Sequence, residues 1–431
     1  MERTMEKVTK IALLGLGTVG GGVYKVIQMQ QEEMERKLGT RVEIKKILVR
    51  NIAKAAIKVK DASVLTNNVD EIMKDPEIRV VVEVMGGIEP ARTYILEALK
   101  AGKHVVTANK DLLAADGHIL METAAEHHCD LFYEAAVAGG IPIIGPLKGS
   151  LSGNHIKEVM GIVNGTTNFI LTKMTQEGME FSDALKLAQD LGYAESDPTA
   201  DVEGLDAGRK MAILASVAFN SRVTFDDVHT EGITKITAKD IRYAKDMGHV
   251  IKLLGVARNT DSGIEVMVHP MLIDENHPLA SVNDSYNAVF VRGDAVQDTM
   301  FYGRGAGELP TASAVVGDIF EIIRNMTFNC CGRIGCTCYK ELPIVPVEET
   351  SSKYFIRIRV EDKTGVLASI AAVFGNNSVS LAQVIQRSRR EDCAELVLIT
   401  EAVKARHLND ALTILRGMSI VRDISSVIRV D

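Results

Sequence analysis

The chain has 431 residues, of which 46% are hydrophobic and 25% charged, and its formal net charge is −8 at pH 7. This length predicts two or three domains with their own cores, and the acidic balance excludes an electrostatic drive toward nucleic acid or anionic membranes. We find no signal-peptide pattern and no apolar run long enough for a membrane span, and the six cysteines do not make a disulfide framework. We therefore expect a cytoplasmic globular protein with reduced thiols.

The N-terminal segment combines a strand, a glycine-rich turn and a helix. Residues 7–14 form an apolar run, GLGTVG places Gly15, Gly17 and Gly20 after it, and residues 21–37 follow a helical pattern. In such a turn the first glycine permits the tight bend, the second lets the backbone approach a pyrophosphate, and the third allows close helix–strand contact. The free N–H groups of the helix start favour phosphate. We predict a dinucleotide site; the alternative is a glycine-rich turn without a ligand.

The second expected strand, residues 42–49, ends before Arg50 rather than before an acidic residue. An Asp or Glu at this place would bind the ribose hydroxyls of NAD, whereas a cation suits the 2′-phosphate of NADP. Arg50, with Lys54 a turn later, therefore favours NADP(H), with NAD(H) as the alternative. Both cations would otherwise be solvated surface groups.

Two further strands end at positions that suit ligand binding. Residues 79–85 are a β-branched run that Gly86 and Gly87 terminate, and residues 104–107 precede Lys110. Ligands of an open α/β sheet bind at the carboxyl ends of its strands. We expect Lys110 to reach the cofactor or the substrate; the alternative is a solvated loop lysine.

The middle of the chain changes from alternating strands and helices to a mixed order, which predicts an α+β domain. Residues 134–142, EAAVAGGIP, are small and irregular, and such backbone beside a carboxylate suits a hard monovalent cation, although small residues more often mean close packing. We expect a helix at 238–254 and strands at 264–271 and 288–292. A helix at 312–324 follows the loop that contains Gly307 and is expected to return to the first domain.

The densest polar segment is residues 191–210, LGYAESDPTADVEGLDAGRK. Asp201 is expected to be a helix N-cap, and Asp206 and Lys210 are four residues apart, so they share one helix face. With Glu195 from the preceding loop, they form a group that could hold an amine and exchange a proton with an oxygen. The alternative is an exposed salt bridge worth about 0.3–0.5 kcal/mol.

Four cysteines lie together in NCCGRIGCTCY. Their spacing fits a zinc site poorly, because zinc sites usually show two C-x₂₋₄-C pairs set well apart. We expect a reduced-thiol loop whose role the sequence does not define: Cys330, Cys331, Cys336 and Cys338.

The C-terminal part follows a linker at 343–350 that is rich in Pro and Glu. Its strands are expected at 354–360, 378–388, 394–400 and 420–430, and its helices at 364–376 and 405–415. This βαββαβ module buries one sheet face under two helices, and its free face or an edge could join a second copy. Gly365 lies in the first strand–helix loop, where backbone can approach a small effector closely.

These segments together resemble homoserine dehydrogenase over essentially the whole chain, and the C-terminal module resembles an ACT domain. The resemblance rests on GLGTVG, TANK, EAAVAGGIP, NGTTNFI, LGYAESDPTADVEGLDAGRK and GRGAGELPTASAVVGD, in this order. Some relatives carry Pro where this chain has Ser196 or Arg304. The family interconverts L-aspartate 4-semialdehyde and L-homoserine with NAD(P)(H), a step toward threonine, methionine and isoleucine.

The resemblance implies roles at matching positions. Lys210 matches the general acid/base and Lys110 an active-site lysine near the nicotinamide. Glu195 and Asp206 match substrate-binding carboxylates. The cofactor positions are Gly15, Gly17, Thr18, Val19, Gly20 and Gly307, and the sodium positions, mostly through backbone oxygens, are Glu134, Val137, Gly139 and Ile141.

The implied architecture is α/β with three parts: a Rossmann-type domain at 1–140 completed by about 305–340, an α+β substrate and dimerisation domain at 141–304, and, after a linker at 341–350, an ACT domain at 351–431. A homodimer or homotetramer and L-threonine as effector are expected by analogy. The alternatives are a dehydrogenase for another small amino acid, and a redox-sensing regulator that binds NADPH and an amino acid without turnover.

Overall fold

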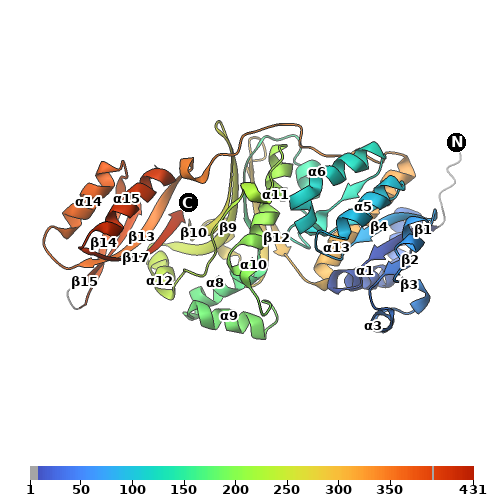
Figure 1. Ribbon diagram of the computed structural model, residues 1–431, viewed down its shortest axis with the longest axis horizontal. Helices are drawn as coiled ribbons and strands as arrows, with labels where there is room; N and C mark the ends of the chain where they lie inside the picture. Colours follow the sequence, from blue (N-terminus) through green and yellow to red (C-terminus); the bar gives the residue numbers. More distant parts are fainter. Residues whose placement is uncertain (1–7, 391–392) are drawn as a thin grey trace. The chain divides into compact units, whose positions relative to one another are not determined.

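The computed structural model describes residues 8–390 and 393–431. The chain forms two compact units (Figure 1). The first unit contains Met1–Val159, Ala212–Asp226 and Asn287–Glu341, and the second contains Met160–Met211, Asp227–Tyr286 and Leu342–Asp431. Within the described residues, no helix has both the length and the apolar character needed to cross a membrane.

The first unit is organised around a six-stranded parallel sheet in the order β3-β2-β1-β4-β5-β6. This is the doubly wound arrangement predicted from the sequence, and the order changes direction next to β1, where such sheets bind ligands. The strands are β1 (Val8–Leu14), β2 (Arg41–Leu48), β3 (Leu65–Thr66), β4 (Ile78–Glu83), β5 (His104–Thr107) and β6 (Leu131–Phe132).

Helices cover both faces of this sheet (Figure 1). The helix expected at 21–37 is two helices, because Gln30 leaves the helical backbone conformation between them. The helices are α1 (Thr18–Met29), α2 (Gln31–Leu38), α3 (Ile52–Ala56), α4 (Asp70–Met73), α5 (Ala91–Lys100), α6 (Lys110–Glu126), α7 (Ile144–Lys148) and α13 (Glu308–Phe328).

Helix α13 completes the core of the first unit, as its apolar pattern predicts. Ala312, Val315 and Ile319 are buried in one cluster with Val23 and Ile27 of α1 and with strand residues of the parallel sheet. A Cβ atom on Gly22 of α1 would lie 2.5 Å from the carbonyl oxygen of Glu308. The close contact of α1 with α13 therefore depends on glycine.

Strands β12 (Asp298–Arg304), β11 (Tyr286–Gly293) and β7 (Ile156–Ile162) are hydrogen-bonded neighbours in this order. The second unit contains strands that are neighbours in the order β9-β10-β17-β13-β15-β14. The remaining elements before residue 342 are α8 (Gly165–Glu177), α9 (Phe181–Asp190), α10 (Thr199–Val202), α11 (Leu205–Phe219), β8 (His229–Thr230), α12 (Ala238–Asp246), β9 (His249–Thr260) and β10 (Gly263–Asp274).

The helix expected at 238–254 is wrong in its second half. Helix α12 ends at Asp246, Gly248 takes a left-handed conformation with φ +71°, and β9 follows and pairs along its length with β10. The residues from Val250 onward have enough β-branched and apolar character for either state, and the strand partner decides between them.

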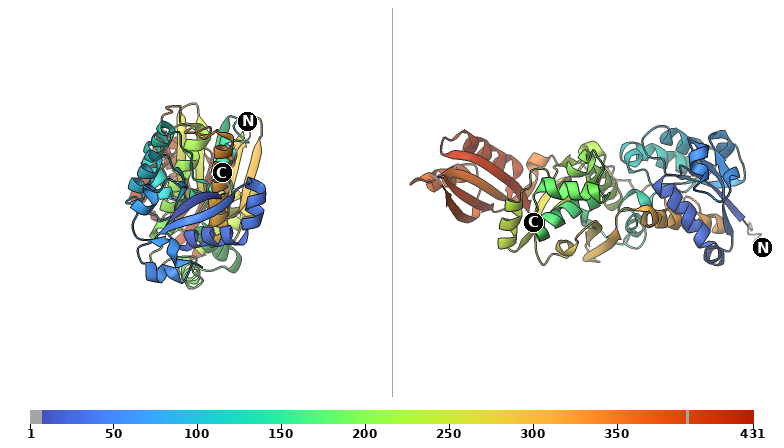
Figure 2. Two further views of the ribbon diagram at one scale, coloured as in Figure 1. Left: turned by 90° about the vertical axis from the view of Figure 1, so that its right-hand side faces the viewer. Right: turned by 90° about the horizontal axis from the view of Figure 1, so that it is seen from below.

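The C-terminal module has the predicted βαββαβ order, with two helices on one face of its sheet (Figures 1 and 2). Its hydrophobic core joins α14 and α15 to the inner face of the strands, through residues such as Ile356, Leu398, Phe374 and Leu412. The elements are β13 (Ser351–Glu361), α14 (Val366–Asn376), β14 (Leu381–Arg390), β15 (Cys393–Thr400), β16 (Val403–Lys404), α15 (Ala405–Gly417) and β17 (Val421–Val430).

The segment expected to be a linker is attached to the preceding strand. Ile264 of β10 donates its N–H to Pro343 and accepts from Val345, and β17 pairs in parallel with the end of β10. One edge of the C-terminal sheet is therefore used inside this chain, and β14 lies at the other end of the strand order.

Candidate active site

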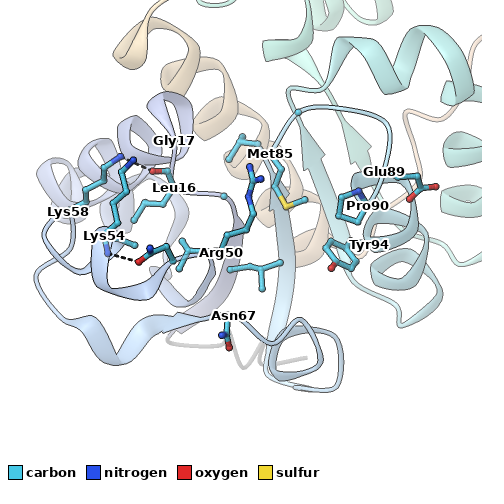
Figure 3. A pocket seen from close by; sticks show the side chains of 17 residues that line it. Leu16, Gly17, Arg50, Lys54, Lys58, Asn67, Met85, Glu89, Pro90 and Tyr94 are labelled. Atoms are coloured by element: carbon cyan, nitrogen blue, oxygen red, sulfur yellow. Dashed lines mark hydrogen bonds between the residues drawn. The ribbon is translucent and has the colours of Figure 1, made fainter.

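The carboxyl ends of β1, β2 and β4 line a cavity of about 840 Å³ in the first unit (Figure 3). Gly15 has φ +110°, and a Cβ there would lie 3.0 Å from the carbonyl oxygen of Val84. A Cβ on Gly20 would lie 2.3 Å from the carbonyl oxygen of Gly15, whereas one on Gly17 would meet open space. Each glycine thus has the local geometry expected of a dinucleotide loop. Gly15 makes the turn, Gly17 leaves the backbone open to a ligand, and Gly20 allows the close contact of helix and strand.

Helix α1 begins directly at this cavity. Gly17 is its N-cap and makes no side-chain cap, Thr18 is exposed, and Val19 is half-buried beside the core. The start of α1 therefore lies beside the Gly15–Gly17 backbone that lines the cavity, which suits a pyrophosphate.

Three cations line the same cavity. Arg50 follows β2, and Lys54 and Lys58 come from α3 and the turn after it; Figure 3 shows the two lysines on one side and the arginine between them and Met85. The Lys58 Nζ donates to the carbonyl oxygen of Leu16 at 3.2 Å. Sequence reasoning named Arg50 and Lys54 but missed Lys58, whose spacing of four from Lys54 was the available signal.

A buried carboxylate that sequence reasoning also missed organises the neighbouring strand ends. Glu83 is 0% exposed; it accepts from the Thr107 hydroxyl at 2.7 Å and from the backbone N–H groups of Met85 and Gly86. It thereby ties the end of β4 to the end of β5. An acidic residue that closes a β-branched run was the signal in the sequence.

Lys110 lies where the sequence predicts, at the start of α6 just after β5. The preceding Asn109 caps α6 through the N–H of Leu112 and donates to the carbonyl oxygen of Gly87 at 2.6 Å. Lys110 is half-buried. Its backbone is therefore fixed at the carboxyl edge of the sheet, next to the turn that ends β4.

The loop around residues 134–142 is buried and tightly turned. The Glu134 carboxylate accepts from the N–H groups of Ile143, Ile144 and Gly145, so it caps the start of α7. Glu134 also donates its backbone N–H to Asp318, whose pKa is raised by burial and by the nearby Glu134 carboxylate. The carboxylate is thus engaged by backbone donors.

The backbone oxygens of this loop have a different environment. Within the described part of the chain, the carbonyl oxygens of Val137, Gly139 and Ile141 accept no hydrogen bond, although all three residues are buried. Buried carbonyl groups are almost always paired. Three unpaired oxygens at alternate positions of one loop fit a hard monovalent cation, which binds oxygen ligands.

The loop that contains Gly307 lies against the same turn. Gly140 donates to the carbonyl oxygen of Arg304, and a Cβ on Gly139 would lie 2.3 Å from that of Gly305. Gly307 is the N-cap of α13 with φ +119°, a conformation that favours glycine. Its contact with a cofactor remains a prediction.

In the second unit, Asp206 and Lys210 form the pair that their spacing predicts. The Lys210 Nζ donates to Asp206 Oδ2 at 2.6 Å and to the carbonyl oxygen of Val163 at 2.7 Å, and both side chains are only 13% exposed. The alternative of an exposed salt bridge is therefore wrong. Asn164 donates to Asp206 at 2.9 Å and to Asp201 at 2.7 Å, so one amide joins the two carboxylates.

The prediction that Asp201 caps the helix is wrong. Asp201 lies inside the short helix α10, Gly204 turns the chain with φ +79°, and α11 begins at Leu205. Burial raises the pKa of Asp201, and the nearby Asp206 carboxylate acts in the same direction, while the Asn164 amide opposes the rise. Asn164, the N-cap of α8, was missed because its role depends on residues about forty positions away.

Glu195 lies on the exposed loop that precedes α10. The loop is held by its backbone: Gln189 donates to the carbonyl oxygen of Glu195 at 3.0 Å, and Thr166 donates to that of Tyr193 at 2.8 Å. The Tyr193 ring lies 4.8 Å from that of Phe169. The convergence of Glu195 with Asp206 on one substrate stays a prediction.

Gly365 is the N-cap of α14, with φ +85° and open space where a Cβ would be. The first strand–helix loop of the C-terminal module therefore has the exposed, glycine-dependent backbone that the sequence suggests. Its role as an effector site stays a prediction.

The parallel sheet, its glycine-rich loop and the basic cavity define an NAD(P)-dependent oxidoreductase, and the βαββαβ module adds an ACT domain. Residues 15–134 match the NAD-binding domain of homoserine dehydrogenase, residues 142–320 match the homoserine dehydrogenase domain, and residues 354–418 match the ACT domain. The chain belongs to the homoserine dehydrogenase family.

Individual relatives agree over nearly the full length. The chain is 44% identical to the homoserine dehydrogenase of Bacillus subtilis over 427 residues, which cover 99% of each protein. It is similar to the crystal structure of a homoserine dehydrogenase from Thiobacillus denitrificans, with 41% identity, a TM-score of 0.94 and coverage of 99% and 98%. It also resembles a hyperthermophilic archaeal homoserine dehydrogenase mutant in complex with NADPH, with 28% identity, a TM-score of 0.64 and coverage of 74% and 98%.

Proposed function

We propose that this enzyme reversibly reduces L-aspartate 4-semialdehyde to L-homoserine with NADPH, in the pathway to threonine, methionine and isoleucine. The observation that carries the proposal is the shielded Asp206–Lys210 pair, because a lysine and a carboxylate held together suit the binding and protonation of a polar amino-acid aldehyde. The bound nicotinamide supplies the hydride.

Lys210 acts on the substrate oxygen. Its ammonium group has three N–H bonds, and Asp206 and the Val163 carbonyl accept two of them. The third is directed to the aldehyde oxygen, where the positive charge stabilises the developing alkoxide and then donates a proton. Lys110 adds a second cation near the nicotinamide.

Glu195 and Asp206 bind the ammonium group of the substrate. Asp206 is held in place by Asn164 and Lys210, whereas Glu195 comes from a loop fixed through its backbone. A fixed carboxylate and a carboxylate on a solvent-exposed loop together provide charge complementarity to an amino acid. The same charges disfavour an aldehyde that lacks the amino group.

The cations of the cofactor cavity favour NADPH over NADH. Arg50, Lys54 and Lys58 lie on one cavity, and the position after β2 that binds the ribose hydroxyls in NAD enzymes carries Arg50. The archaeal relative in complex with NADPH supports the same choice. Gly15, Gly17, Thr18, Val19 and Gly20 hold the pyrophosphate.

A sodium ion would be held by the main-chain oxygens of Val137, Gly139 and Ile141. Because the Glu134 carboxylate caps α7, Glu134 would contribute through its own carbonyl oxygen, which accepts only a long bond of 3.4 Å from Val137. The ion would stiffen the loop that contacts residues 304–305, next to Gly307.

The ACT domain is proposed to bind L-threonine near Gly365 and to lower activity, and the protein is proposed to be a homodimer or homotetramer. ACT modules suggest a small-molecule effector. Threonine inhibits only if it binds one conformation more tightly than another.

One assay tests the reaction: NADPH absorbance is followed on addition of L-aspartate 4-semialdehyde to the purified protein. We expect oxidation of NADPH with formation of homoserine. Turnover with a different amino-acid aldehyde but not with this one would support the rival dehydrogenase. Binding of NADPH without turnover of any aldehyde would support a redox-sensing regulator.

A further inference from the structure

The cysteine-rich loop after α13 divides into two groups with different surroundings. Cys330 and Cys331 lie in a segment fixed by buried partners: Gly332 donates to Asp130 at 2.7 Å, and Cys330 donates its N–H to the carbonyl oxygen of Asn325. Cys336 is exposed and Cys338 is half-buried. Both line a cavity of about 520 Å³ in the first unit, together with Glu122, Tyr133 and Arg222.

The first group does not fit a metal site, although His104, Asp130 and Cys331 bring ligand atoms within 4.8 Å of one another. His104 Nδ1 accepts the backbone N–H of Asp130 at 2.9 Å, and burial lowers the His104 pKa, so the proton of the neutral ring is on Nε2. That nitrogen faces the Cys331 sulfur at 3.8 Å and is not free to bind a metal. Burial also raises the pKa of Cys331 to about 11, which leaves an unreactive thiol.

In the second group the two cysteines contact each other directly. The backbone N–H of Cys338 donates to the Cys336 sulfur at 3.5 Å. The Cys338 thiol donates to the carbonyl oxygen of Ser216 at 3.7 Å. Only Thr337 separates the two cysteines, so closure of a disulfide requires only a local rearrangement of this segment.

The charges around the pair distinguish its two members. Hydrogen bonding from Cys338 lowers the pKa of Cys336 to about 6, and the Lys148 cation acts in the same direction. These effects outweigh burial and the nearby Glu122 carboxylate, which both raise the pKa. The hydrogen bond to Cys336 and burial raise the pKa of Cys338, against Lys148 and Arg222. Lys148 is held beside the loop by its bond to the carbonyl oxygen of Gly335 at 3.1 Å.

We propose that Cys336 and Cys338 are a redox-active dithiol that closes to a disulfide on reaction with a small disulfide such as oxidised glutathione. Cys336 is the attacking sulfur, because it is exposed and beside Lys148, and Cys338 is the resolving thiol. This site is separate from the cofactor cavity, whose lining does not include either residue.

The exchange is balanced in two steps. The Cys336 thiolate attacks one sulfur of the small disulfide, forms a mixed disulfide and releases one thiolate. Cys338 then loses its proton to solvent, attacks the Cys336 sulfur and releases the second thiolate. The two cysteines lose two electrons and two protons, and the small disulfide becomes two thiols.

The test uses the full-length reduced protein, incubated without oxygen in mixtures of oxidised and reduced glutathione. After acid quenching and alkylation, peptide mapping is expected to show the peptide with Cys336 and Cys338 lighter by two hydrogen atoms, and dithiothreitol is expected to reverse the change. The Cys338→Ser variant should instead accumulate one glutathione on Cys336. Cys393→Ser is the matched control and should leave the disulfide unchanged.

A second measurement identifies the attacking sulfur. The alkylation rate of Cys336 should rise through about pH 6 and then level off, whereas an ordinary thiol continues to gain rate up to about pH 8.5. Lys148→Met should move that midpoint to higher pH. The proposal would be overturned by a disulfide between other cysteines, or by the absence of a disulfide in the most oxidising glutathione mixture. A Cys336 midpoint equal to that of an ordinary thiol would also overturn it.

Discussion

Replacement of Arg357 by Met should loosen the attachment of the ACT module to α12. Arg357 of β13 is 7% exposed and donates through Nε to Asp240 at 2.9 Å, and Asp240 is 0% exposed. Its NH1 group also lies 3.6 Å from Glu395 of β15. The guanidinium thus bridges two buried carboxylates within the second unit.

The size of the effect follows from what the substitution leaves behind. Removal of one partner of a buried ion pair costs about 3–5 kcal/mol, because the other charge stays buried. Asp240 keeps three neutral donors, from the Thr237 backbone and hydroxyl and from the Ser426 hydroxyl. Glu395 keeps Lys239 and Tyr243, which lower its pKa against the effect of burial. We therefore expect the lower end, about 3 kcal/mol.

Hydrogen exchange measures the loss of stability locally, around the substituted residue. A local measurement is needed because a chain of several domains does not unfold in one step. A loss of about 3 kcal/mol should accelerate exchange in α12 and β13 about a hundredfold. Arg359→Met, at an exposed arginine of the same strand, is the control and should have little effect. Asp240→Asn combined with Arg357→Met should recover part of the protection. Equal exchange in the Arg357 and Arg359 variants would refute the buried-pair argument.

Three further predictions concern ligands. Arg50→Ala should lower the ratio of kcat/KM for NADPH to that for NADH about tenfold or more, since a lost charge-assisted bond to phosphate costs about 1.5–3 kcal/mol; an unchanged ratio would exclude Arg50 from reading the 2′-phosphate. Replacement of sodium by choline at constant ionic strength should reduce activity reversibly, because the oxygens of Val137, Gly139 and Ile141 lose their cation; full activity in choline would remove the ion from the account. L-Threonine should lower the initial rate of the intact enzyme, and Gly365→Ala should raise the half-inhibitory concentration about fivefold or more. If threonine leaves the rate of the unaltered protein unchanged and gives no heat of binding, it is excluded as the effector.

The structure changes how the effector test is best designed. Truncation near residue 347 suggests itself from the sequence, because the linker composition separates the catalytic groups from the ACT module. In the structure that cut would remove Arg357 and β17, leaving Asp240 as an unpaired buried charge and the end of β10 without its partner. A point change at Gly365 avoids both losses.

Local patterns predicted the features that depend on neighbouring residues. The strand–turn–helix order around Gly15, Gly17 and Gly20 and the i,i+4 contact of Asp206 with Lys210 follow directly from backbone periodicity. Both were confirmed in position and geometry. The burial of the pair, which separates a site from a surface salt bridge, came only from the structure.

Features that depend on distant residues were missed or wrong. Asn164 bridges Asp201 and Asp206 across about forty residues, and Glu83 acquires its role only when β5 lies beside β4. The residues after Gly248 became a strand because β10 offers a complete pairing partner. Tertiary context decides each of these cases, and a single sequence does not show it.

The central claim is that Lys210 supplies the proton at the substrate oxygen. Lys210→Ala should lower kcat by about 10²–10⁴, as for loss of a general acid, while the Kd for NADPH is unchanged. Lys173→Ala is the matched control, since Lys173 forms the same i,i+4 pair with Glu177 on an exposed part of α8. Steady-state kinetics with L-aspartate 4-semialdehyde and calorimetry with NADPH measure both quantities. A kcat for Lys210→Ala close to that of the Lys173→Ala control would contradict the mechanism.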